Sequence, residues 1–132
     1  MNANPYEAVL EDLKKRRLPP EVKAAVTIVL DKKAERVVVL KLKGVSEMTD
    51  YLLICHGNSG RQTKAIADAL VEQLRDGFRL KPLGVEGERQ GDWVLIDYVD
   101  FVINVFTPET REKYALEKLW MDAKRYDFSP ME

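Results

Sequence analysis

The sequence contains very little of the material from which most chemical sites are made. Its 132 residues include one cysteine, Cys55, and one histidine, His56. A single cysteine excludes an intramolecular disulfide and any zinc site with several cysteine ligands, and it favours a reducing compartment. One histidine leaves few ligands for a transition metal. We therefore expect no metal and no other cofactor.

Long apolar runs and a strong excess of charge are also missing. No stretch approaches the roughly 18 apolar residues of a membrane-spanning helix, and the polar N-terminus lacks the apolar segment of a signal peptide. Glu7, Glu11 and Asp12 speak against an organelle transit peptide, so we expect a cytoplasmic protein that does not bind membranes. The net charge of −1 argues against nucleic-acid binding over the whole surface, since such binding needs an excess of Lys and Arg.

What is present is typical of one globular domain, with 45% hydrophobic and 33% charged residues. Apolar spacing and turn residues predict four helices, over residues 5–18, beginning at 21, over about 60–76, and beginning at 107. They also predict strands at 36–42, 51–55 and 83–86, followed by a hairpin that ends at 106. The predicted fold class is α/β, a mixed β-sheet of about five strands with flanking helices. We divide the chain into an N-terminal helical extension (1–20), a domain (21–126) and a flexible tail (127–132).

Two of these helices have defined inner faces. The helix after Gly60 is predicted to end at Gly77 and to turn five apolar side chains inward, namely Ala65, Ile66, Ala69, Leu70 and Leu74. With the preceding strand it makes half of a βαβ crossover. The helix opened by Thr107, as cap, and Pro108 is predicted to pack on the sheet through Leu116, Leu119, Trp120 and Ala123.

The segment Val85–Phe106 predicts a β-hairpin with two different faces. Alternate side chains of a strand point to opposite sides, so Val94, Ile96 and Tyr98 form the core face. The other face carries Trp93, Leu95 and Asp97, a mixture that suits a half-exposed docking surface. Five carboxylates surround Arg89, which gives a local charge of −4, from Glu86, Glu88, Asp92, Asp97 and Asp100. A basic partner would be steered here, although Trp93 could equally be a core residue.

The loop Gly57–Lys64 follows a strand and opens a helix, as many active-site loops do. A nucleophile elbow needs glycine where Arg61 stands, and a phosphate-binding Walker loop needs glycine at Gln62, so both patterns fail. Arg61 and Lys64, beside free amides at the helix start, could hold an anion. We favour a tight turn with Asn58 or Ser59 as helix cap.

Two further pairs suggest catalysis, and their spacing argues against it. Cys55 and His56 are adjacent in a strand and project to opposite sides, so they do not make a nucleophile and base. Asp97 and Asp100 could hold magnesium, but a spacing of three places them on opposite faces unless a turn intervenes. If Tyr98-Val99 is the hairpin turn, these carboxylates flank its mouth.

Five motifs in order resemble the ribosomal silencing factor family, also called Iojap-related proteins. They are Thr49–Ile54 (TDYLLI), Gly57–Leu70 (GNSGRQTKAIADAL), Leu83–Gly87 (LGVEG), Asp92–Asp100 (DWVLIDYVD) and Tyr114–Trp120 (YALEKLW), and the resemblance covers about residues 21 to 125. It implies a nucleotidyltransferase-like α/β fold that lacks the catalytic carboxylate pair. It also implies a protein that is not an enzyme.

The resemblance further implies a partner and a function. Family members bind the large ribosomal subunit through its universal protein fourteen, block joining of the small subunit and repress translation under nutrient limitation. The partner-facing positions would be Trp93, Asp97 and Asp100, with Glu86 and Leu95 beside them. Direct contact with nucleic acid is expected to be small.

The sequence departs from the family pattern at two positions. Val99 stands where the family usually has glycine, and a β-branched residue disfavours positive φ. Asn104 replaces a common histidine, so a pH-sensitive or metal-binding role is not available there. Two alternatives stay open, a nucleotidyltransferase-like enzyme or nucleotide-binding protein using Gly57–Lys64, and a free homodimer paired through the Trp93 face.

Overall fold

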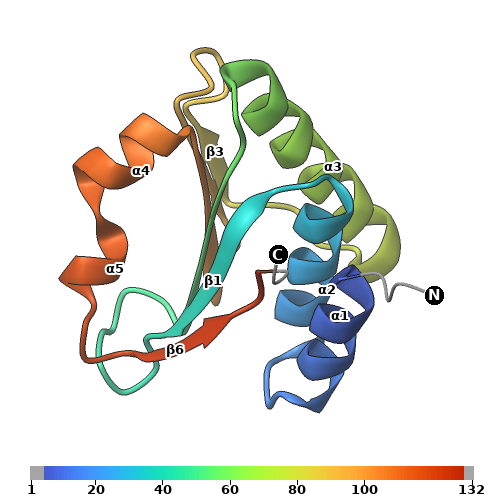
Figure 1. Ribbon diagram of the computed structural model, residues 1–132, viewed down its shortest axis with the longest axis vertical. Coiled ribbons are helices and arrows are strands. Elements are labelled where there is room, and N and C mark those ends of the chain that lie inside the picture. Colours follow the sequence, from blue (N-terminus) through green and yellow to red (C-terminus); the bar gives the residue numbers. More distant parts are fainter. Residues whose placement is uncertain (1–4, 130–132) are drawn as a thin grey trace.

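The computed structural model describes residues 5–129 and arranges them in three layers, with a sheet between two groups of helices (Figure 1). Helices α1 (Pro5–Lys15), α2 (Pro20–Asp31) and α3 (Gly60–Phe78) cover one face, and the short α4 (Pro108–Tyr114) and α5 (Leu116–Leu119) lie on the other. The strands are β1 (Glu35–Lys41), β2 (Tyr51–His56), β3 (Gly84–Glu86), β4 (Trp93–Asp97), β5 (Phe101–Phe106) and β6 (Lys124–Asp127). The predicted α/β class is confirmed.

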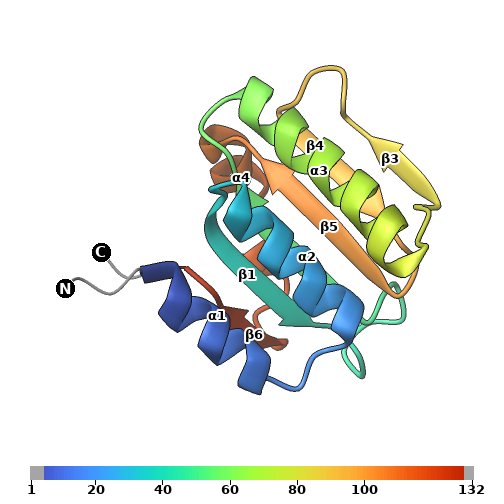
Figure 2. The same ribbon diagram turned by 90° about the vertical axis from the view of Figure 1, so that its right-hand side faces the viewer.

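Within residues 5–129 the sheet has six strands in the order β3-β4-β5-β2-β1-β6 (Figure 2). Neighbouring strands are antiparallel except β2 and β5, which are parallel. It follows that β3 also runs parallel to β2, so α3 is a crossover helix as predicted, with β5 and β4 lying between the two strands it connects. The prediction of about five strands missed β6.

Apolar side chains on the two faces of the sheet form two separate clusters. The larger one lies under α1, α2 and α3, and its members include Val22, Val26, Val29, Val37, Val39, Leu53, Ile66, Leu70, Leu74 and Ile103. The smaller one, on the other face, consists of Val38, Leu40, Leu42, Leu52, Ile54, Phe106 and Ala123. Residues of β1 and β2 alternate between the clusters because successive strand side chains point to opposite faces. These strands are therefore covered on both sides and read as continuous apolar runs.

Helix α3 differs from its prediction at its end and on its inner face. Gly77 does not end it, because the helix continues to Phe78 and Arg79 supplies the left-handed cap at φ +57°. Ala65 is exposed, and Ala67 takes the inner position instead. The side of α3 that packs on the sheet is rotated slightly from the predicted one. Apolar spacing alone does not fix the end of a helix or so small a rotation.

The chain after β5 departs most from the sequence-based expectation. The predicted long helix is broken at Ala115, where φ is +47°, and α5 ends at Leu119, which is 68% exposed rather than packed on the sheet. The flexible tail prediction is wrong for Asp127, which ends β6, and for Phe128, which is 1% exposed and donates its N–H to the Val37 carbonyl at 2.8 Å. Residues 130–132 lie outside the described part.

The segment before residue 20 packs against the rest of the domain. Leu13 and Leu18 are buried members of the larger cluster, and α1 ends at Lys15, earlier than the predicted helix. The division between an extension and a domain at residue 20 stays a prediction. Among the described helices, all are too short or too polar to cross a bilayer.

Candidate functional site

One half of the sheet face that carries α4 and α5 is left open. These helices and the segment after them, through Leu116, Trp120 and Ala123, contribute to the smaller cluster over β1, β2 and Phe106. Over β3 and β4 the same face is accessible, because Leu95, Asp97 and Val102 are half-buried and Glu86 is exposed. We call Glu86, Trp93, Leu95, Asp97 and Val102 the open face.

Strand register brings these residues together from three strands. Glu86 lies opposite Leu95 and Gly84 lies opposite Asp97 in the β3–β4 pair. Asp97 in turn lies opposite Val102 in the β4–β5 pair. The predicted sharing of one face by Trp93, Leu95 and Asp97 follows from this register. Val102 and Gly84 were missed, because only the strand pairing shows that they flank Asp97.

Trp93 is packed on one side and accessible on the other. Its ring lies 5.0 Å from the Phe106 ring and 4.7 Å from the Tyr114 ring, measured between centroids. Its Nε1–H donates a hydrogen bond of 2.9 Å to Oδ1 of Asn104. The indole is therefore held in one orientation while part of it remains exposed. Docking of a partner on the exposed part stays a prediction.

The turn between β4 and β5 is the predicted one, at Tyr98-Val99. The Asp97 side chain accepts a 2.7 Å hydrogen bond from the Val99 N–H, and Val99 has a φ of +74°. Asp97 and Asp100 flank this turn. In the described part of the chain, no three His, Cys, Asp or Glu side chains are grouped as metal ligands. Asp97 is used as a turn cap, and the residue is half-buried.

The loop 42–50 joins this turn and adds apolar surface next to it. The Thr49 hydroxyl donates to the Val99 carbonyl at 2.9 Å, and the Asp50 N–H donates to the Asp100 carbonyl at 3.1 Å. Exposed apolar side chains on the two segments are Val45, Met48 and Val99. Acidic groups and exposed apolar groups together are typical of a surface that contacts another macromolecule.

The loop Gly57–Lys64 caps a helix, as favoured from the sequence. Ser59 Oγ accepts from the Gln62 N–H at 3.1 Å, and the Gln62 side chain accepts from the Asn58 N–H at 2.7 Å. The Thr63 hydroxyl bonds to the Gly91 carbonyl, which ties the β3–β4 loop to the start of α3. Several groups at this helix start are therefore already used within the protein.

The two residues that could hold an anion there differ in their exposure to solvent. Arg61 is exposed and Lys64 is half-buried toward the β3–β4 loop. Anion binding by Arg61 and Lys64 stays a prediction.

Cys55 and His56 lie on opposite faces, and neither has the environment of a catalytic group. Burial raises the pKa of the Cys55 thiol to about 12, which removes the reactive thiolate at neutral pH. His56 Nδ1 lies 3.0 Å from Nη1 of the buried Arg111, whose Nε donates to Glu117 at 2.8 Å. Burial, and next the Arg111 charge, lower the pKa of His56. This network was not foreseen, and it connects α4 to β2.

The comparisons with known proteins agree with the geometry. Residues 15–132 match the model of a family described as ribosomal silencing factor during starvation. The chain belongs to the ribosomal silencing factor family. It is 51% identical over 100 residues to the ribosomal silencing factor of Halalkalibacterium halodurans, covering 75% of this chain and 84% of that protein. It is 44% identical over 98 residues to the Bacillus subtilis factor, covering 74% and 81%.

A solved structure supports the assignment of this chain to the ribosomal silencing factor family. The crystal structure of a Chromobacterium violaceum protein, 30% identical, superposes with a TM-score of 0.74 over 76% of this chain and 83% of that one. Family membership makes the protein a non-enzymatic regulator that acts on the ribosome. The enzyme alternative is therefore set aside, and the predicted resemblance is confirmed.

Proposed function

We propose that the protein binds the large ribosomal subunit through its universal protein fourteen, blocks joining of the small subunit and represses translation under nutrient limitation. The action takes place in the cytoplasm. The observation that carries this proposal is a half-exposed Trp93, held in one orientation beside carboxylates on an uncovered sheet face. Rigid aromatic side chains of this kind provide much of the binding energy in protein interfaces.

The charge of the surface fits a basic protein partner better than RNA. Glu86, Glu88, Asp92 and Asp100 are exposed and Asp97 is half-exposed, while Arg89 is the cation in the same segment. Five carboxylates and one guanidinium give −4. Such a field attracts a basic protein and repels phosphates. Little direct contact with ribosomal RNA is therefore part of the proposal.

The proposed mechanism is obstruction, and it requires no bond to be made or broken. The open face is supported by a continuous sheet, so binding costs little reorganisation of the protein. Once the open face is docked, the remaining bulk of the domain occupies space that the small subunit needs.

Co-sedimentation with purified large subunits tests this assignment. Trp93→Ala is expected to weaken binding by about 2 kcal/mol or more, roughly 30-fold. Glu86→Lys should mainly slow association and make it less sensitive to salt, because one attractive charge becomes repulsive. Glu112→Lys, an exposed change on α4, is the matched control. The assignment is refuted if folded Trp93→Ala and Glu86→Lys proteins pellet like the unmodified one.

A further inference from the structure

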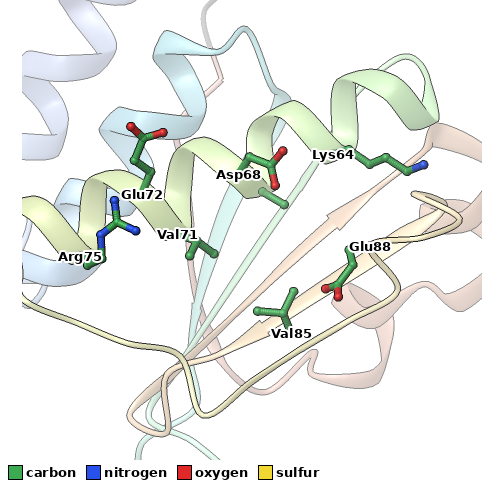
Figure 3. Close-up of a pocket in the computed structure, with 8 residues that line it drawn as sticks. Lys64, Asp68, Val71, Glu72, Arg75, Val85 and Glu88 are labelled. Atoms are coloured by element: carbon green, nitrogen blue, oxygen red, sulfur yellow. The ribbon is translucent and has the colours of Figure 1, made fainter.

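A groove lies on the opposite side of the sheet from the open face, between α3 and the edge strand β3 (Figure 3). It is open to solvent and has a volume of about 650 Å³. Most of its lining comes from one side of α3, with Val85 of β3 and Glu88 of the following turn opposite; the α3 residues are Lys64, Ala67, Asp68, Val71, Glu72 and Arg75. The proposed docking through Trp93 does not occupy this groove.

The outer flank of β3 carries unpaired backbone in the described part of the chain. β3 is the first strand of the sheet order and pairs only with β4. The Leu83 N–H donates to the Asp97 carbonyl at 2.7 Å, so the next N–H, that of Gly84, is directed to the free flank, since successive amides of a strand alternate. Gly84 and Glu86 are exposed. This edge can therefore accept another strand.

Gly84 itself has no evident role within the fold. Its φ is not in the left-handed region, and a Cβ placed on it would meet no atom within 4 Å. Neither a turn nor close packing thus requires glycine here. Glycine inside a strand is also found where another backbone approaches closely, and such an approach is possible along the free flank of β3.

The groove beside this edge has an apolar floor and acidic walls. Ala67 and Val71 lie one helical turn apart on α3, and Val85 faces them from β3. Arg75 is paired with Asp76 at 3.1 Å. The lining carries three carboxylates, those of Asp68, Glu72 and Glu88, against the two cations of Lys64 and Arg75, which gives a net charge of −1. The charge of the walls favours a cationic occupant.

We propose that the groove binds an extended basic peptide, which adds to the sheet as a strand beside β3. A strand placed about 4.8 Å from β3 would turn alternate side chains toward α3. Small apolar side chains would pack on Val71 and Val85, and lysine or arginine would meet Asp68, Glu72 and Glu88. Because β3 has three residues, its backbone offers few hydrogen bonds. The carboxylates must therefore supply much of the selectivity.

A short, acidic edge strand also deters aggregation, and this is the simplest alternative explanation. That role accounts for the length of β3 and for Glu86. It does not account for an apolar floor between the edge and α3, nor for the carboxylates of Asp68 and Glu72 on the α3 wall with Glu88 opposite. Both features are expected where alternate side chains of a bound strand are recognised.

The test uses the full-length protein, labelled with ¹⁵N, and synthetic capped octapeptides in which every second residue is serine and the residues between alternate lysine and valine, so that both types face α3 in an extended strand. Peptide up to about 1 mM, the weak end of measurable affinity, is expected to shift the amide signals of Gly84, Val85 and Val71 in a saturable manner. The same peptide with glutamate in place of lysine, and the lysine peptide with alternate N-methylated amides, should leave them unchanged. The first removes the charge match and the second removes the strand donors.

Two variants distinguish peptide binding in the groove from binding at the open face. Asp68→Lys combined with Glu72→Lys changes two exposed side chains and should abolish the shifts, with folding checked by circular dichroism. Trp93→Ala should leave them intact, so failure here and failure of the ribosomal assignment are distinguishable. The proposal would be overturned if the lysine peptide caused no shifts, if the glutamate peptide caused equal shifts, or if the shifts were confined to the open face. It would also be overturned if light scattering showed a dimer of the free protein and the Asp68→Lys, Glu72→Lys variant were a monomer, because a second copy would then fill the groove.

Discussion

The indole N–H of Trp93 donates to Oδ1 of Asn104 across two neighbouring strands, at 2.9 Å. Asn104 is 1% exposed, so this bond forms where water does not compete. Phe106 and Tyr114 support the ring from its faces. The orientation of the most prominent side chain of the open face therefore depends on a buried residue of the neighbouring strand.

Replacing Asn104 by alanine is expected to lower the free energy of unfolding by about 1–3 kcal/mol, because the indole N–H loses its acceptor. The same change should weaken large-subunit binding by freeing the Trp93 ring. Urea unfolding and co-sedimentation measure the two effects. Asn104→His, which restores an acceptor and matches the family pattern, should recover both; unchanged binding in Asn104→Ala would show that the ring does not need this support.

Val99→Gly is expected to stabilise the protein by about 1 kcal/mol, since a β-branched residue at positive φ carries a strain of roughly that size. Val99 has a φ of +74° and is 58% exposed, so little apolar burial is lost. Thermal and urea unfolding are the measurements. Val45→Gly, an exposed loop valine without positive φ, is the control and should bring no gain. Equal effects at the two positions would mean that the strain is already relaxed.

Gly84→Leu should reduce large-subunit binding at least tenfold while stability changes by no more than about 0.5 kcal/mol. Gly84 lies opposite Asp97 on the open face, and the space around it is empty, so leucine would fit the fold and cover the carboxylate. Gly77→Ala, in the last turn of α3, is the control; it should raise stability and leave binding unchanged. Full binding by Gly84→Leu would place the partner elsewhere.

Stability is expected to fall as the pH drops below 6.5, the ordinary pKa of histidine. Arg111 is always protonated and donates to His56 Nδ1, so the folded ring is neutral. Burial first, and then Arg111, lower the His56 pKa; Glu35 acts in the opposite sense and is outweighed. Between the folded pKa and 6.5 the unfolded state binds more protons, so stability rises with pH in that window and is fully present above it.

His56→Gln tests this pH dependence, because glutamine keeps an acceptor for Arg111 and does not titrate. Denaturant unfolding across the acid range should show the unmodified protein losing stability relative to His56→Gln as the pH falls below 6.5. Curves that stay parallel throughout would mean that His56 does not contribute to the acid sensitivity.

Local sequence pattern was sufficient for most of the fold and for the alternation of side chains on β4. Alternation in Trp93–Asp97 predicted which side chains share a face. A turn at Tyr98-Val99 with Asp97 and Asp100 on either side was one of two interpretations of their spacing, and the structure has this turn. The missed strand β6 has only four residues. Its pairing with β1 depends on contacts between segments some 85 residues apart, which no local window contains.

The sequence by itself determined the α/β class, the family and the identity of the exposed aromatic and acidic residues, because periodicity and motif order are properties of neighbouring positions. Only the tertiary structure decided what surrounds them: Asn104 beneath Trp93, Gly84 beside Asp97, and the groove between β3 and α3. The physical reason is that strand register and helix packing set distances between residues far apart in the chain. Those distances decide whether a side chain is buried, supported or free to meet a partner.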